Sequence, residues 1–196
     1  MRKLIGLMIL SIFLLGFYRK TNNGHPVRWK RHNTVQYAFC KNMKHLKKVD
    51  LIYPFKKWQK ALKSRLKLRY AGFTSNNQDW NTIHVCIDKT WKWPKKFYNA
   101  MALTLVTYNP HAGNIQVVRV YLNGRLYKWK KGNRRDRREL MNLREILLHE
   151  VGHALGLLHS RSRRSIMYPR ILLYKTMRHL PKRDASSIIK LYAINP

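Results

Sequence analysis

The sequence predicts an α+β domain, and three observations support this class. The chain has 196 residues, 45% of them hydrophobic, which is enough for one globular domain with a sizeable core. Strand-like and helix-like runs follow one another with no internal repeat or low-complexity linker. The longest helix-like run carries two histidines four residues apart, and a third histidine follows six residues later. We therefore expect a sheet packed against helices, one of which bears the chemistry.

The first half of the chain predicts two strands and a helix. Residues 35–40 (V-Q-Y-A-F-C) are rich in β-forming side chains and predict a strand. Residues 51–68 have apolar side chains near helical spacing and predict a helix. Residues 83–87 would place Ile83, Val85 and Ile87 on one face and His84 and Cys86 on the other, which is the periodicity of a strand.

Two further strands precede the histidine-bearing helix. Residues 102–108 are β-rich, and residues 109–114 (N-P-H-A-G-N) predict a turn. Residues 115–122 predict another strand, which Asn123 and Gly124 end.

The last third of the chain predicts two helices. Residues 136–155 predict the long helix, and a short basic loop follows it. Residues 181–192 predict the last helix, with proline at its start, Asp184 in its first turn and apolar side chains on one face.

The run H-E-V-G-H-A-L-G-L-L-H carries the functional prediction. His149 and His153 are four residues apart, so on a helix they project from one face and can share one metal ion. Gly156 can adopt a positive φ and end the helix, and the reversed chain can then deliver His159 as a third ligand. Glu150 follows the first ligand, where its carboxylate can take a proton from water activated by the metal.

Three histidines favour a catalytic zinc site. They leave a fourth coordination position for water, which a structural zinc site lacks. The alternative is that these are ordinary helix residues near a C-cap glycine. That reading would leave two histidines and a glutamate without partners on an apolar helix face.

The sequence of these motifs resembles that of the matrixin family of metzincin peptidases. The histidine run matches the long metzincin signature. The string S-I-M-Y-P at residues 165–169 is similar to the Met-turn, in which Met167 would lie beneath the zinc site. Pro169 and the preceding Tyr168 match matrixins, whereas astacin-like and serralysin-like peptidases have a tyrosine in place of Pro169. The element order over residues 27–195 is also similar to that of a matrixin catalytic domain.

The resemblance implies a particular fold and substrate path. The fold has a twisted five-stranded mixed sheet with two helices. A cleft holds the zinc, and a small C-terminal part after Gly156 contains the Met-turn and one helix. An extended substrate would pair with the sheet edge near residues 102–108, as in β-augmentation. Pro169, Arg170 and Ile171 would line the pocket for the residue after the scissile bond.

We expect one catalytic Zn²⁺ as the cofactor, without calcium or a structural zinc. The chain has only eight acidic residues, and none cluster with the spacing of oxygen ligands. His84 and His111 are isolated, so we interpret them as strand or surface residues. The chain also lacks the P-R-C-G-x-P-D string of a cysteine switch. We therefore expect a minimal catalytic domain that does not use this form of latency.

The chain has two cysteines, Cys40 and Cys86, both at the ends of β-rich runs. If the protein is exported, one disulfide is allowed. The alternative is a pair of buried thiols. The matrixin sheet implied by the resemblance would place their strands side by side.

The N-terminus predicts export. Arg2 and Lys3 precede an apolar run over residues 4–18, and Arg19 and Lys20 follow it. This pattern is typical of a secretory signal peptide. No small-residue cleavage site is evident, so residues 1–20 are a signal peptide or an N-terminal membrane anchor. Residues 21–196 would form the catalytic domain, outside the cell or tethered to its membrane.

The composition is strongly basic, with 41 Lys and Arg residues and a formal net charge of +33. Such a field attracts anionic partners such as cell-wall polymers, acidic glycans or lipid. No motif for a specific nucleic acid is present. We expect a secreted, monomeric zinc endopeptidase acting on protein or peptide substrates. The alternatives are a polyanion- or wall-binding protein with an incidental zinc site, or another class of metzincin.

Overall fold

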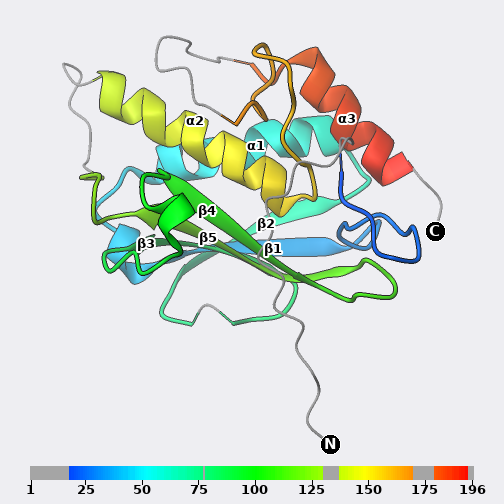
Figure 1. The fold of residues 1–196 in the computed structure, drawn as a ribbon, viewed down its shortest axis with the longest axis horizontal. Coiled ribbons are helices and arrows are strands. Elements are labelled where there is room, and N and C mark those ends of the chain that lie inside the picture. The colour runs from blue at the N-terminus through cyan, green and yellow to red at the C-terminus, as the bar shows by residue number, and fades with distance from the viewer. Residues whose placement is uncertain (1–17, 77, 130–136, 170–178, 194–196) are drawn as a thin grey trace, which may run out of the picture.

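The fold is a single mixed β-sheet with helices packed on one face (Figure 1). A computed structural model describes residues 18–76, 78–129, 137–169 and 179–193. The sheet has five strands in the order β2-β1-β3-β5-β4. Their bounds are β1 Thr34–Cys40, β2 Lys67–Thr74, β3 Thr82–Asp88, β4 Ala102–Tyr108 and β5 Ile115–Asn123. The α+β class and the five-stranded mixed sheet are confirmed.

The strand directions make β4 an antiparallel edge strand. β1 is parallel to both β2 and β3, and β3 is parallel to β5. β4 pairs antiparallel with β5 and has no strand on its other side within the described sheet. One row of backbone N–H and C=O groups on β4 is therefore available to an added strand.

Three α-helices accompany the sheet, with bounds α1 Lys48–Leu62, α2 Arg137–Ala154 and α3 Lys182–Ala193. Helices α1 and α2 lie across the same face of the sheet, and α3 lies beside them (Figure 1). Two short 3₁₀ helices, η1 Lys41–Met43 and η2 Lys95–Phe97, lie in connections. Among the described residues, no helix is long and apolar enough to cross a membrane.

The core forms between the helical layer and the inner face of the sheet. Tyr37 of β1 stacks on Phe55 of α1 with ring centroids 3.9 Å apart. Trp58 of α1 is fully buried and donates from Nε1 to the carbonyl oxygen of Leu148, at 2.8 Å. This bond satisfies the polar atom of a buried indole and also joins α1 to the histidine-bearing helix.

The predicted helix over residues 51–68 is wrong at its C-terminal end. Helix α1 ends at Leu62, and Lys63 adopts φ 51°. The chain then enters β2, the fifth strand that no predicted run had supplied. Leu66 fits helical spacing from Leu62, but Leu66 and Leu68 also fit the period of two that a strand requires. The apolar pattern alone could not separate these readings.

The structure describes both the predicted turn and the two cysteines, whose pairing the sequence left open. In the turn after β4, the Asn109 side-chain oxygen accepts hydrogen bonds from the backbone N–H groups of His111 and Ala112, both at 2.9 Å. Cys40 at the end of β1 and Cys86 in the neighbouring β3 form a disulfide. It links the two strands on the sheet face opposite Phe39 and Val85, which belong to the core.

Candidate metal centre

Helix α2 brings the first two predicted ligands together. His149 and His153 are one turn apart on α2, and His159 follows the end of the helix. One ring nitrogen from each of the three lies within 4.8 Å of the others. His149 is buried, whereas His159 is exposed. The described chain holds no other such group of three potential metal ligands.

A Schellman motif ends α2 and turns the chain towards His159. Gly156 has φ +100°, which only glycine adopts without strain. Its N–H donates to the carbonyl of His153 at 2.9 Å, and the N–H of Leu157 donates to that of Gly152 at 3.0 Å. These are the two hydrogen bonds that define the motif.

The end of α2 is also held by residues far away in sequence. Trp29 Nε1 donates to the carbonyl oxygen of Ala154 at 2.9 Å, and the Tyr192 hydroxyl donates to that of Leu155 at 3.1 Å. Arg28 donates to the carbonyl oxygen of Leu191 at 2.8 Å. The N-terminal segment and α3 therefore fix the position at which the helix stops.

Hydrogen bonds determine which ring nitrogens face the centre of the cluster. His149 Nδ1 lies 2.7 Å from the carbonyl oxygen of Ile166, and His153 Nδ1 lies 2.8 Å from that of Leu157. A carbonyl oxygen can only accept, so both Nδ1 atoms carry a proton. Burial lowers the pKa of both rings, and neighbouring rings lower that of His153 further. Both rings are therefore neutral near pH 7, and their Nε2 atoms carry lone pairs.

The donor set fits a zinc ion. The two Nε2 atoms lie 3.0 Å apart, and two lone pairs facing each other at this distance repel unless a cation lies between them. Two nitrogens that each bind a tetrahedral zinc at about 2.0–2.1 Å would lie about 3.3 Å apart. His159 is exposed as a whole residue, but partial desolvation of its ring and the neighbouring His149 lower its pKa to about 4, so the third imidazole is also neutral near pH 7.

Met167 lies directly beneath the histidine-bearing helix. It is 2% exposed, and a Cβ added to Gly152 would lie 2.3 Å from its sulfur atom. Ser160 N–H donates to the carbonyl oxygen of Met167 at 2.8 Å and closes the loop that carries His159. The residue predicted to form the Met-turn thus supports the cluster from below.

Asp184 of α3 anchors the turn that carries Met167. Its carboxylate accepts hydrogen bonds from the Ser165 hydroxyl and from the backbone N–H of Ile166, the latter at 3.0 Å. The Ile166 carbonyl oxygen in turn accepts from His149. A chain of contacts therefore runs from α3 to the first ligand. The sequence had identified Asp184 only as a first-turn residue of a helix, since no local pattern reports a contact across 18 residues.

The Glu150 side chain points towards β4, where it contacts Thr104. It is 7% exposed, and burial raises the pKa of its carboxyl group to about 7, while a hydrogen bond from Thr104 acts in the opposite direction. A buried carboxyl group with a pKa near neutrality can accept and release a proton. No sequence motif indicated this role for Thr104.

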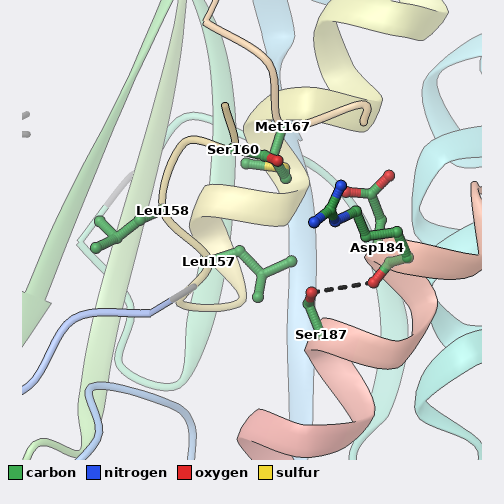
Figure 2. A pocket seen from close by; sticks show the side chains of 7 residues that line it. Leu157, Leu158, Ser160, Met167, Asp184 and Ser187 are labelled. Atoms are coloured by element: carbon green, nitrogen blue, oxygen red, sulfur yellow. Dashed lines mark hydrogen bonds between the residues drawn. The ribbon is translucent and has the colours of Figure 1, made fainter. Parts of the chain in front are cut away.

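A small hollow lies between the end of α2, the turn bearing Met167 and α3 (Figure 2). Its volume is about 10 Å³, which is roughly the room for one water molecule. Leu157, Met167 and Asp184 are among the side chains that line it. It is a packing gap behind the Met-turn and too small to receive a substrate side chain.

The predicted pocket wall is only partly described. Pro169 is exposed at the end of the Met-turn. Arg170 and Ile171 lie outside the described residues, as do residues 1–17 of the predicted signal peptide or anchor. His84 is buried in β3 and His111 is exposed in the turn after β4.

A mixed sheet and three imidazoles converging beside a buried glutamate are the arrangement of a zinc metallopeptidase. The sequence pattern of the family described as Matrixin matches residues 28–193. The chain therefore belongs to the matrixin family, and the alternative of another metzincin class is excluded.

Individual relatives match the chain over short stretches. Metalloendoproteinase 1 of Glycine max is 46% identical over 55 residues, which are 28% of this chain and 18% of that protein. A putative matrix metalloproteinase of Trichoplusia ni ascovirus 2c is 72% identical over 29 residues, 15% of this chain and 6% of that protein. Metalloendoproteinase 2-MMP of Arabidopsis thaliana is 43% identical over 56 residues, which are 29% of this chain and 15% of that protein. The chain thus spans less than a fifth of the length of these relatives.

Replacing Gly156 with alanine is expected to destabilise the fold more than the same change at Gly72. Both glycines have similar positive φ, +100° and +96°, so strain costs each variant about 1–2 kcal/mol. At Gly156 the added Cβ would also lie 2.4 Å from the Val27 carbonyl oxygen, whereas nothing lies within 4 Å at Gly72. This overlap adds about 1–3 kcal/mol. Urea unfolding measures both, and equal losses would contradict the role given to Gly156.

Proposed function

We propose that the chain is a zinc-dependent endopeptidase that hydrolyses internal peptide bonds of protein substrates. One observation carries the proposal: three neutral imidazoles converge beside a buried glutamate at the edge of the sheet. His149, His153 and His159 would hold the zinc. When bound, zinc supplies a Lewis acid that activates water and polarises the scissile carbonyl.

Glu150 supplies the proton transfer. Its carboxylate accepts the proton of the attacking water and delivers it to the leaving amine. The raised pKa of Glu150 suits both steps, because a base near neutrality also releases its proton readily. The carbonyl oxygens of Ile166 and Leu157 hold His149 and His153 in the orientation that binding requires.

The substrate binds in extended form along β4. This strand borders α2, and its outer edge has no strand partner within the described sheet. A peptide added there would form backbone hydrogen bonds and cross the histidine cluster. The pocket for the residue after the cut would be lined by Pro169, Arg170 and Ile171.

Cleavage of casein or gelatin in a zymogram tests this function. The purified chain is expected to clear the gel, and a zinc chelator is expected to abolish clearing that added zinc restores. Clearing that persists with the chelator would contradict the proposal. The absence of clearing with zinc-loaded protein would favour a zinc-binding protein of another kind.

We further propose that the protein is exported and that residues 1–20 direct it across or into a membrane. The Cys40–Cys86 disulfide supports this, because such bonds persist in oxidising compartments. The N-terminal charge and apolar pattern support it independently.

The positive charge also supports an anionic partner. Of the six acidic side chains that the structure describes, four are buried: Asp50, Glu145, Glu150 and Asp184. The exposed surface therefore has few carboxylates to offset its lysines and arginines. Asp50 is further paired with Arg144. We infer that the outer surface attracts polyanions.

The strongest candidate for this contact is a surface that we call the α1–β2 basic surface. Its members are exposed and belong to α1 or to the residue that follows it, beside β2: Lys48, Lys56, Lys60 and Lys63. Lys56 and Lys60 are one turn apart on α1, so their side chains share one helix face. Lys48 over the Tyr70 ring, at 4.7 Å, joins the two elements.

An acidic glycan chain is the partner that this surface fits best. The surface is built mainly from lysines, which contact anionic groups as flexible point charges. The large exposed aromatic side chains are Trp80 and Tyr98, outside this surface, so it offers no ring for base stacking. It lies at the sheet edge opposite β4, and a bound glycan would leave the cleft open.

Charge reversal at two sites is expected to separate this surface from a general charge effect. One variant changes Lys48, Lys56, Lys60 and Lys63 to glutamate. The control changes the exposed Lys89, Lys92, Lys95 and Lys96, which alters net charge equally. The first variant is expected to elute from a sulfated-polysaccharide column at clearly lower salt than the control. Equal shifts would show that overall charge, and not the α1–β2 basic surface, holds the polymer.

A further inference from the structure

The proton-transfer residue has a dedicated side-chain partner on the neighbouring strand. Thr104 lies in β4 opposite Val120 of β5. Paired residues of antiparallel strands project to the same face of a sheet, and Val120 is fully buried in the core. The Thr104 side chain therefore projects towards the helical layer, where it meets Glu150 of α2.

The Thr104 hydroxyl bonds the Glu150 carboxylate directly. Its Oγ1 is in hydrogen-bond contact with Glu150 Oε2 and lies 3.3 Å from the Glu150 carbonyl oxygen. A hydroxyl has one proton to donate, and the closer contact is to the carboxylate. No other described side chain hydrogen-bonds this carboxylate. The remaining residues of the strand near the contact, Leu103 and Leu105, have no donor side chain.

We propose that Thr104 is a positioning residue for catalysis, which holds the Glu150 carboxylate in the orientation for proton transfer. The inference rests on the proposed function of Glu150. A glutamate has several rotatable bonds, and a buried carboxylate without a partner would sample other orientations or lose its charge. Fixing Oε2 leaves Oε1 to take the proton of the attacking water. Geometry held within a fraction of an ångström is what such a step requires.

The contact also couples the substrate strand to the catalytic helix. Thr104 belongs to the strand on which the substrate is proposed to lie, and Glu150 belongs to the helix that carries two ligands. The hydroxyl thus sets the spacing between the bound peptide and the proton acceptor. Loss of the hydroxyl should impair the chemical step while substrate binding along the backbone of β4 persists.

Three variants test the proposal in the full-length, zinc-loaded protein. Thr104→Val removes the hydroxyl and retains the branched shape. It is expected to lower kcat by about 10- to 100-fold, as the loss of a hydrogen bond to a charged group does, with KM changed less than about threefold. Thr104→Ser restores the hydroxyl and is expected to recover most of kcat. Thr34→Val makes the same change at an exposed position of β1 and is expected to match wild type.

A double-variant cycle identifies the route of the effect. If Thr104 acts through Glu150, adding Thr104→Val to Glu150→Gln lowers kcat little beyond Glu150→Gln alone. Additive losses, a normal kcat in Thr104→Val, or no recovery in Thr104→Ser would each overturn the inference. Zinc content and thermal midpoint of each variant show whether the metal site and fold are intact. Normal activity in Glu150→Gln would instead overturn the proposed function itself.

Discussion

Replacing Glu150 with glutamine is expected to lower kcat by about 10²- to 10⁴-fold, the range for loss of a general base. Glutamine has the same shape, so it fills the same buried space and can still accept a hydrogen bond from Thr104. It cannot take up the proton of the attacking water near pH 7. Peptide hydrolysis under saturating substrate measures kcat directly.

Zinc content is the internal control for this variant. Glu150 is not one of the three converging ligands, so Glu150→Gln is expected to keep about one zinc per chain. A large loss of activity with metal retained assigns Glu150 to the chemical step. Near wild-type kcat would show that another group accepts the proton.

Replacing His153 with alanine is expected to remove most of the bound zinc and with it the activity. His153 occupies the middle of the cluster, with ring centroids 4.7 Å from those of both His149 and His159. Two remaining imidazoles provide too few ligands for a stable site. Removing a residue that only orients a ligand typically lowers metal affinity by about 10- to 100-fold. Removing the ligand His153 itself is expected to lower the zinc affinity by more than this.

His111→Ala is the matched control for this loss. His111 is exposed in the turn after β4, and the same substitution there is expected to leave zinc and activity unchanged. Metal analysis after gel filtration compares the variants with wild type at about one zinc per chain. Equal zinc in His153→Ala and wild type would rule out the three-histidine assignment.

The metal cluster could be predicted because its spacing coincides with helix geometry. His149 and His153 are neighbours on any α-helix, and Gly156 indicates the turn that brings His159 to them. These features need no knowledge of the rest of the fold. The edge position of β4 was predicted from the resemblance to the matrixin family, because local periodicity identifies a strand but does not give its neighbours in the sheet.

The supports of the cluster could not be predicted in the same way. Thr104 and Glu150 are 46 residues apart, and Asp184 and Ile166 are 18 residues apart. Such contacts depend on how the sheet and α3 are placed around α2. Strand β2 was missed for a different reason. Leu66, just before β2, continues the apolar spacing of α1, and the break at Lys63 requires a positive φ that lysine rarely adopts.

The contacts of α3 have a consequence for the time at which the protein becomes able to cut. Asp184 secures the turn beneath the histidines, and Tyr192 secures the end of the helix that carries two of them. Both residues belong to the part of the described chain that is synthesised last. A growing chain that already contains all three histidines still lacks the groups that hold them in place. The proposed hydrolysis would therefore require α3 to be in place, because the three histidines alone lack the groups that fix their positions.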